Sequence, residues 1–311
     1  MSLFSRQRQL PGWVALAPGR GLARLACVEA AAGQKPRLSW VAEQDWADPA
    51  AGLRALKSVR ELHQRRVIAV LERNQYQVVT MDAPDVPRPD WKDATRWLLQ
   101  ERVDFPVDTA ALDVLEIPAD AAQRRKPGLI AVAAPRAHLQ PMVTQAQQAG
   151  TPLTAIDVAE TALRNISGLL EEPGRGQALL HVGESHSSLV VTAGGELLLS
   201  RQMDANLAGL THADADLRQQ AFERTSLELQ RTLDGFERSF THVSLARVLV
   251  APGQALEDFM AYVRELLYVP VQTLELNQAL DLSAAPELAA DPLIQAAYLV
   301  AIGATLRGEP A

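Results

Sequence analysis

The same order of short apolar strands and glycine turns occurs twice in this chain. Residues 13–28 form two apolar runs around the turn Pro-Gly-Arg-Gly, and a third run follows over 37–46. Residues 178–203 repeat this order as an apolar strand, a polar turn, a second strand, a Gly-Gly turn and a third strand. Apolar runs of this length joined by glycine-containing turns are typical of antiparallel hairpins. We therefore predict two related halves, each of which opens with a meander of three strands.

Helices and further strands are expected after each meander. In the first half, a helix is predicted over 48–62 with Asp48 at its N-cap, and strands are predicted over 66–72 and 76–84. The stretch 128–170 reads as strand, helix, strand and helix, which is typical of an α/β crossover unit. The second half continues with a helix over 217–240, a strand over 247–253, a helix over 255–268, a strand over 270–276 and an apolar helix over 291–308.

The composition excludes several classes of protein. The chain has 311 residues, of which 48% are hydrophobic, so it can bury a large core. Its net charge of -7 argues against a nucleic-acid partner. The single cysteine, Cys27, allows no internal disulfide, and we expect it to be buried. No secretory pattern and no apolar stretch of about 18 residues is found, so we expect a cytoplasmic protein.

Two α/β halves that open with hairpins resemble the superfold of actin, Hsp70 and the sugar kinases. The order of the segments resembles the PilM family of type IV pilus assembly proteins, and more closely its MshI members from the mannose-sensitive haemagglutinin (MSHA) pilus. Five stretches carry this resemblance: MDAPDVPRPDWKDATRWLLQERVDFPVD, IDVAETALRNI, GELLLSRQM, LELQRTLDGFE and AIGATLRG. The resemblance implies an actin-like ATPase (ribonuclease H-like) α/β fold. It places the first half at 12–172, with an inserted subdomain at about 82–126, and the second half at 173–311.

The resemblance also implies where a nucleotide would lie. In the superfold two hairpin turns hold the phosphates of ATP, and a third turn lies under the adenosine. Those turns correspond here to residues 17–20, 181–188 and 250–255. Backbone amides and guanidinium groups are suited to phosphate oxygens. The residues that could meet a nucleotide are Gly19, Arg20, Arg24, Gly183, Ser185 and Gly253.

The two phosphate turns depart from the family pattern. The family has an aspartate in each turn, whereas Ala17 and His181 stand at those positions. Mg²⁺ prefers carboxylate and water ligands, and a neutral imidazole is a poor ligand for it. We therefore predict a degenerate site with no catalytic residue, no bound metal and no resident cofactor. Binding of ATP, with or without magnesium, stays open as an alternative.

Two other readings of candidate residues are possible. His181 and His186, with Glu184 between them, could hold zinc or nickel. Polar residues in such a turn more often satisfy backbone groups, and we expect that role here. Asp157 is the nearest candidate for the catalytic carboxylate of a kinase on this fold, and we expect it to be structural.

The resemblance to PilM implies a partner as well. In that family a groove formed by the insert and the adjoining core takes the cytoplasmic tail of a PilN-like inner-membrane protein, which would bind as an extended strand or polyproline II segment. Asp90 is expected to cap a helix with Trp91, Ala94, Trp97 and Leu98 on one face. The candidate groove residues are Trp91, Trp97, Phe105 and Leu112. The alternative is that these residues fill the core of the insert itself.

The leading hypothesis is a cytoplasmic scaffold that associates with the inner-membrane face of a type IV pilus. An ATP-binding conformational switch or ATPase of the same fold is the main alternative, and the missing aspartates argue against it.

Overall fold

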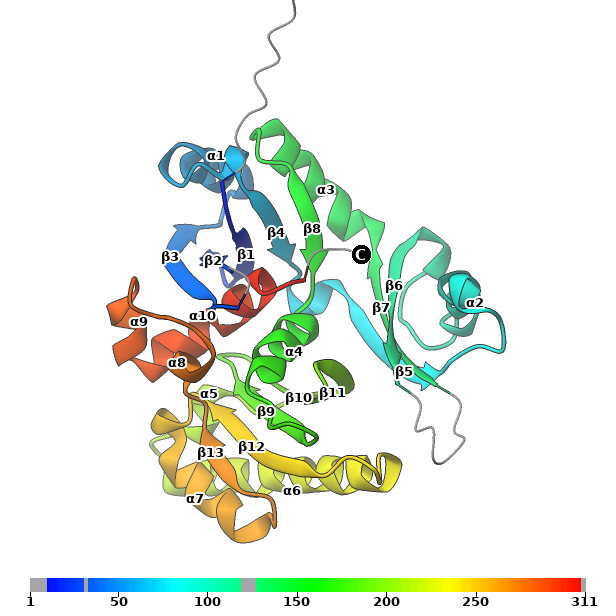
Figure 1. Cartoon of the computed structure of the whole chain (residues 1–311), viewed down its shortest axis with the longest axis vertical. Helices are drawn as coiled ribbons and strands as arrows, with labels where there is room; N and C mark the ends of the chain where they lie inside the picture. The colour runs from blue at the N-terminus through cyan, green and yellow to red at the C-terminus, as the bar shows by residue number, and fades with distance from the viewer. Residues whose placement is uncertain (1–9, 31–32, 119–126, 309–311) are drawn as a thin grey trace, which may run out of the picture.

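The chain folds into two five-stranded lobes and a smaller three-stranded subdomain (Figure 1). The structure is a computed structural model, and it describes residues 10–30, 33–118 and 127–308. In Figure 1 the first lobe lies at the top, the second at the bottom and the subdomain at the right. Helices α4 and α10 lie in the centre, between the lobes.

The two large sheets have the same topology. Their strand orders are β3-β2-β1-β4-β8 and β11-β10-β9-β12-β13. In each sheet the first three strands form an antiparallel meander, and the last two strands run parallel to the first. The first sheet consists of β1 (Trp13–Gly19), β2 (Leu22–Glu29), β3 (Arg37–Asp45), β4 (Arg66–Val70) and β8 (Leu153–Asp157). The second consists of β9 (Gly176–Val182), β10 (Ser187–Ala193), β11 (Glu196–Met203), β12 (Leu245–Ala251) and β13 (Val271–Thr273). The prediction of two related halves is therefore confirmed.

Two helices cover the outer face of each sheet. Helices α1 (Pro49–Val59) and α3 (Arg136–Gln148) pack on the first sheet, and α6 (Ala215–Ser239) and α7 (Glu257–Leu266) pack on the second. Asp48 begins α1, because its carboxylate accepts hydrogen bonds from the amides of Ala50 and Ala51. Asp214 caps α6 in the same way. The predicted N-cap of α1 is thus confirmed.

The inner helices are exchanged between the halves of the sequence. Helix α10 (Pro292–Thr305), from the end of the chain, packs on β1 and β2 of the first lobe. Helix α4 (Ala159–Leu169), from the first half, packs on β9, β10 and β11 of the second lobe. The two helices cross at Gly303, where any Cβ would overlap the carbonyl oxygen of Ala162. The boundary expected at 172/173 therefore separates the two sheets and their outer helices. It does not separate the inner helices, because α4 and α10 each pack on the sheet of the other half.

The subdomain has its own sheet and core. Its strand order is β5-β7-β6, with β5 at Gln77–Asp82, β6 at Ala110–Ile117 and β7 at Gly128–Pro135. Helix α2 (Trp91–Leu98) packs against β6. The residue range expected for the insert, 82–126, is shorter than the subdomain. Most of β5 precedes this range and all of β7 follows it. Residues 119–126 lie outside the described residues.

The crossover unit expected over 128–170 is wrong. Strand β7 pairs with β5 and β6 in the subdomain, whereas β8 pairs with β4 in the first lobe. The intervening helix α3 therefore leads from one sheet to another and does not connect two strands of one sheet.

Short helices complete the chain. The α-helical turns are α5 (Leu207–Leu210), α8 (Leu276–Ala279) and α9 (Pro286–Ala290). The 3₁₀ turns are Leu62–Gln64, Arg73–Gln75, Arg88–Asp90, Val107–Thr109 and Gln254–Leu256. Among the described residues, no helix has the length and apolar character needed to cross a membrane.

Cys27 is buried between the first sheet and its outer helices, as expected. Burial is the main cause that raises the pKa of its thiol to about 11. The thiol is therefore protonated at neutral pH and acts as a small apolar side chain.

Candidate functional site

The first hairpin turns of the two lobes face the same cavity. The β1–β2 turn has Arg20 and Gly21 at its centre, with φ of 53° and 77°, as a type I′ turn requires. The β9–β10 turn is closed by a hydrogen bond of 3.0 Å from the Gly183 amide to the carbonyl oxygen of His186. Both turns line a cavity of about 390 Å³, which also has walls from α10 and the 3₁₀ turn at 73–75. This is the place where the sequence predicts a nucleotide site.

Five of the six predicted nucleotide-contacting residues lie together in this cavity. Its lining includes Gly19, Arg20, Arg24, Gly183 and Ser185. The structure therefore brings the two predicted phosphate turns together from segments more than 150 residues apart in sequence.

A carboxylate of the chain itself occupies the space between the two turns. Arg20 Nη1 lies 3.2 Å from Glu184 Oε2, and Arg20 Nη2 donates to the Glu184 carbonyl oxygen at 3.2 Å. Arg24 Nη2 lies 2.9 Å from Glu184 Oε1, and Arg24 also pairs with Glu43 at 3.3 Å. Both predicted anion-binding side chains are thus paired with protein carboxylates. Partly exposed pairs of this kind add little stability, but they neutralise the charge that would attract a phosphate.

Gly253 lies outside the lining of the cavity, although its neighbour Pro252 belongs to it. Gly253 has an ordinary helical φ of -63° at the start of a 3₁₀ turn. A Cβ at this position would lie 2.6 Å from Thr273 Oγ1 on β13. This glycine therefore allows the turn to pack against the neighbouring strand, and a nucleotide contact is not needed to explain it.

His181 links the second phosphate turn to helix α10. Its Nε2 atom lies 2.9 Å from the carbonyl oxygen of Ala296, so Nε2 carries the proton and donates it. Burial is the main cause that lowers the pKa of His181 to about 4. The imidazole is therefore neutral at physiological pH and holds the β9 strand end against the helix. This contact explains why a histidine, and not a carboxylate, stands at this position.

Among the described residues, no third side chain is placed to complete a metal site with His181 and His186. His186 Nδ1 lies 3.0 Å from Ser185 Oγ, and burial together with the nearby Arg73 lowers the His186 pKa. Within 10–30, 33–118 and 127–308, no group of three His, Cys, Asp or Glu side chains is placed to hold a metal ion.

A buried polar pair that no sequence motif indicates lies beside the cavity. Tyr76, which lines the cavity, donates from its hydroxyl to Glu160 Oε2 at 2.7 Å. Burial raises the pKa of both groups. Arg73 donates to the Tyr76 carbonyl oxygen at 2.8 Å and to Gln202 of the second lobe. No motif marks these residues, because their chemistry depends on contacts between segments that are distant in sequence.

Asp157 has the structural role that was expected. Its Oδ1 atom accepts hydrogen bonds from the Val158 amide at 2.9 Å and from the Thr161 hydroxyl, which orders the start of α4. Its other oxygen lies 3.5 Å from Arg307 Nη1. These partners occupy the carboxylate that a kinase would need for catalysis.

The four candidate groove residues are not on one surface. Trp91 and Leu112 are buried in the subdomain core, and Phe105 packs partly buried against it. Trp97 is 70% exposed. The predicted helix face is wrong in this respect, because α2 buries Trp91, Thr95 and Leu99 and leaves Trp97 and Leu98 in solvent. Asp90 precedes α2, but its side chain makes no capping hydrogen bond.

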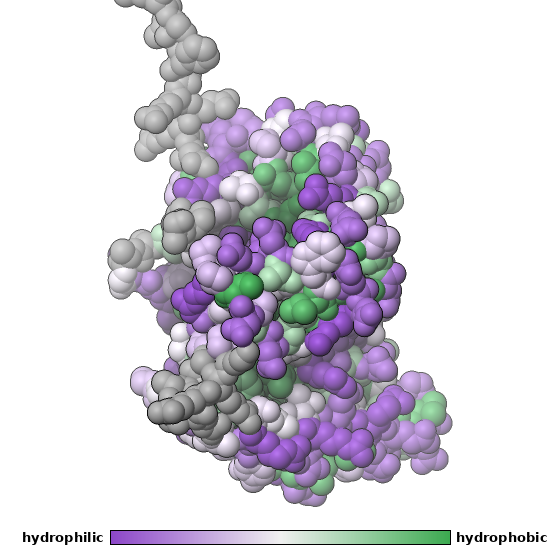
Figure 2. All heavy atoms as spheres, turned by 90° about the vertical axis from the view of Figure 1, so that its right-hand side faces the viewer, coloured by the Kyte–Doolittle hydropathy of each residue, from purple (hydrophilic) through white to green (hydrophobic). Residues whose placement is uncertain are grey.

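The face of the molecule on the side of the subdomain is mostly hydrophilic, with hydrophobic residues gathered towards its middle (Figure 2). In the subdomain, Val86, Trp97 and Leu98 are exposed hydrophobic residues. Of the four predicted partner-binding residues, Trp97 is exposed and Phe105 is partly exposed, whereas Trp91 and Leu112 could contact another protein only after a rearrangement of the subdomain.

Comparisons with known proteins identify the fold. No protein-family model matches the chain, and no curated protein matches it. Among solved structures, the chain is similar to one from the PilM-PilN type IV pilus biogenesis complex, with a TM-score of 0.71, 20% identity, and coverage of 96% of this chain and 99% of that chain. It is also similar to a Bacteroides thetaiotaomicron protein with an actin-like ATPase fold and unknown function, with a TM-score of 0.50, 9% identity, and coverage of 94% and 99%. The chain therefore has the actin-like ATPase fold.

Proposed function

We propose that this protein is a cytoplasmic scaffold of type IV pilus biogenesis that binds the cytoplasmic tail of a PilN-like inner-membrane protein. The observation that carries this proposal is the similarity to the protein of the PilM-PilN complex, which extends over 96% of this chain at a TM-score of 0.71. The order of the sequence stretches described above favours an MSHA-type pilus and an MshI-like protein. The scaffold would lie at the inner-membrane face through its partner.

We further propose that the scaffold works with a degenerate nucleotide site and is not an enzyme. Two observations support this. Ala17 and His181 stand where the resembling family has the aspartates of its phosphate turns. Glu184 already pairs with Arg20 and Arg24 between the turns. A nucleotide would have to displace this carboxylate, and neither turn has the aspartate that holds magnesium in the resembling family.

A titration with ATP tests the degenerate site. For the wild-type protein we expect no heat in calorimetry at millimolar ATP, with or without magnesium. For Glu184→Gln, we expect pyrophosphate to bind about tenfold tighter than to wild type, because the substitution frees Arg20 and leaves Arg24 with Glu43 as its remaining carboxylate partner. Glu172→Gln removes the same charge from a pair with Arg175 on the surface and is the matched control. Tight, magnesium-dependent binding of ATP to the wild type would favour the conformational switch instead.

The two tryptophans of α2 separate partner binding from folding. We expect Trp97→Ala to weaken the binding of a synthetic PilN-like tail about tenfold, because exposed aromatic residues dominate many interfaces, and to leave stability unchanged. Trp91→Ala should instead lower the free energy of unfolding by about 3 kcal/mol, since it empties a buried site. Tyr268→Ala removes an equally exposed aromatic ring from the second lobe and is the control for binding. Equal tail affinity for wild type and Trp97→Ala, measured by fluorescence anisotropy, would exclude α2 from the interface.

A further inference from the structure

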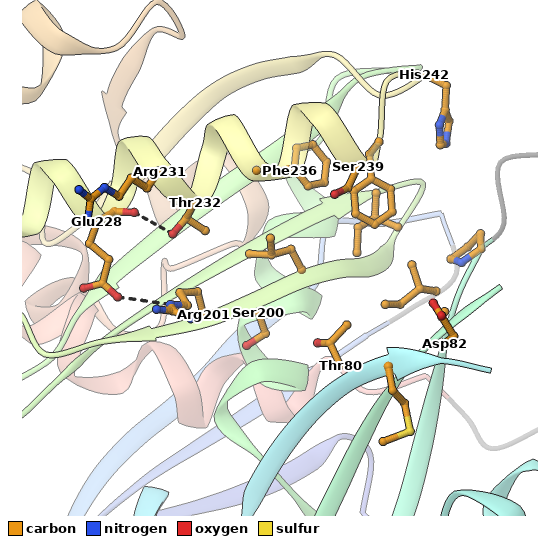
Figure 3. A pocket seen from close by; sticks show the side chains of 18 of the residues that line it. Thr80, Asp82, Ser200, Arg201, Glu228, Arg231, Thr232, Phe236, Ser239 and His242 are labelled. Carbon is orange, nitrogen blue, oxygen red and sulfur yellow. Dashed lines mark hydrogen bonds and ion pairs between the residues drawn. The ribbon is translucent and has the colours of Figure 1, made fainter. Parts of the chain in front are cut away.

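A larger cavity lies between the subdomain and the second lobe (Figure 3). Its volume is about 1120 Å³. Helix α6 and strand β11 form the side that belongs to the second lobe, and the ends of β5, β6 and β7 form the side that belongs to the subdomain. None of the residues of the nucleotide-like cavity belongs to its lining. This is therefore a separate site.

An unpaired strand edge faces this cavity. Strand β11 is the outermost strand of the second sheet. Four consecutive residues of it, 198–201, line the cavity. The register of β11 with β10 shifts at Leu198, which forms a β-bulge, and such bulges are common at the edges of sheets. Strand β6 of the subdomain approaches β11, but among the described residues no backbone group forms a hydrogen bond with the outer edge of β11.

Helix α6 presents a continuous stripe to the same cavity. Its lining residues Arg224, Leu227, Glu228, Arg231 and Gly235 follow the spacing of one helical face. The opposite face of α6 is buried in the second lobe through Phe222, Leu229 and Leu233, and the buried Phe236 lies at the border between the two faces and also lines the cavity. Leu227 is 46% exposed, so the stripe offers apolar as well as charged surface.

The charge of the cavity is opposite to that of the chain. Four arginines line it, against the two carboxylates Asp82 and Glu228, whereas the whole chain has a net charge of -7. Arg201 pairs with Glu228 at 3.3 Å, and Figure 3 shows this pair across the gap between β11 and α6. In the part of the chain that the structure describes, Arg102, Arg224 and Arg231 have no ion-pair partner. The cavity therefore attracts negative charge.

We propose that this cavity is the docking site of an extended, carboxylate-bearing segment of a partner protein, which adds as a strand to the edge of β11. Backbone hydrogen bonds to β11 would hold the segment. Its carboxylates would pair with Arg102, Arg224 and Arg231, and its apolar side chains would contact Leu227 and Phe240. The free strand edge favours a peptide over a polyphosphate or a nucleic acid, because those ligands have no backbone amides to pair with it. This site is independent of the proposed tail-binding function and of Trp97.

The test is a selection of 12-residue peptides displayed on phage against the full-length protein. We expect the selected peptides to be rich in Asp and Glu between β-branched residues. The double variant Arg224→Glu and Arg231→Glu should bind them about tenfold or more weakly than wild type, because repulsion replaces two ion pairs. Arg54→Glu, an exposed arginine on α1, is the matched control and should bind as wild type does. Circular dichroism and urea unfolding verify that the double variant folds.

Methylation of alternate backbone amides identifies strand addition. Successive amides of a strand point to opposite edges, so methylation of one set should abolish binding and methylation of the other set should be tolerated. The proposal is overturned if no peptide is selected, if the peptides lack carboxylates, if the double variant binds as Arg54→Glu does, or if both methylated sets bind equally. Binding of polyphosphate or an oligonucleotide in place of any peptide would also overturn it.

Discussion

Gly303→Val is expected to lower the free energy of unfolding by about 3 kcal/mol. Gly303 lies where α10 crosses α4, and a Cβ there would overlap the carbonyl oxygen of Ala162. The obstacle is backbone, so a side-chain rotation cannot relieve it and the helices must move apart. The Gly303 carbonyl oxygen also accepts a hydrogen bond of 2.9 Å from Asn165 Nδ2, which the same movement would break. Urea denaturation followed by circular dichroism measures the change.

Gly235→Ala is the matched control for this substitution. Gly235 lies inside α6. Apart from its chain neighbours and the nearby backbone of the same helix, no atom lies within 4 Å of the position that a Cβ would take. We therefore expect this variant to be more stable than wild type by about 0.5 kcal/mol, since alanine is the better helix former. Equal stability of Gly303→Val and wild type would show that α4 and α10 do not need their close approach.

Lowering the pH from 7 to 4.5 is expected to reduce stability through His181 by about 2 kcal/mol. In the folded protein the pKa of His181 is lowered to about 4, mainly by burial, from an ordinary value of 6.5. Between these two values the unfolded chain binds a proton that the folded chain does not. Stability therefore falls as the pH decreases through this window, and the contribution is constant below pH 4. Urea denaturation at several pH values measures the slope.

His181→Gln isolates this contribution from that of the carboxylates. Glutamine can still donate a hydrogen bond towards Ala296, but it does not titrate. The pH dependence of its stability between 7 and 4.5 should be shallower than that of wild type by the amount given above. His138→Gln removes an exposed histidine and is the matched control for the substitution itself. The same slope in His181→Gln and wild type would contradict the assignment.

The repeated hairpins could be predicted from the sequence because their signal is local. Apolar runs and glycine turns define β1, β2, β9 and β10, and the repetition of this order predicts two related halves, whereas the resemblance to the actin superfold implies that their turns face each other. The acidic N-caps of α1 and α6 are local signals too. Five of the six residues that the resemblance implies for a nucleotide site line one cavity, and whether they contact a nucleotide stays a prediction.

The features that the sequence did not predict depend on contacts between distant residues. Glu184 faces Arg20 only because the two lobes close on each other. The face of α2 was misjudged because Trp97 is as apolar as Trp91, and only the position of the subdomain sheet decides which tryptophan is buried. A strand–helix–strand pattern such as that over 128–170 is compatible with two strands in one sheet or in two different sheets. Only the pairing partners of β7 and β8, which lie elsewhere in the chain, decide between these arrangements.

The exchange of α4 and α10 between the lobes has a consequence for synthesis on the ribosome. Strands β1 and β2 emerge first, but the helix that covers their inner face comes from residues 292–305, near the other end of the chain. Until those residues have been translated, the inner face of the first sheet, with Trp13, Ala15 and Ile68, has no α10 to cover it. The first lobe thus cannot complete its core before residues 292–305 have been synthesised, and until then we expect the nascent chain to carry an apolar surface that chaperones recognise. We therefore expect neither half of the sequence to fold when it is expressed alone.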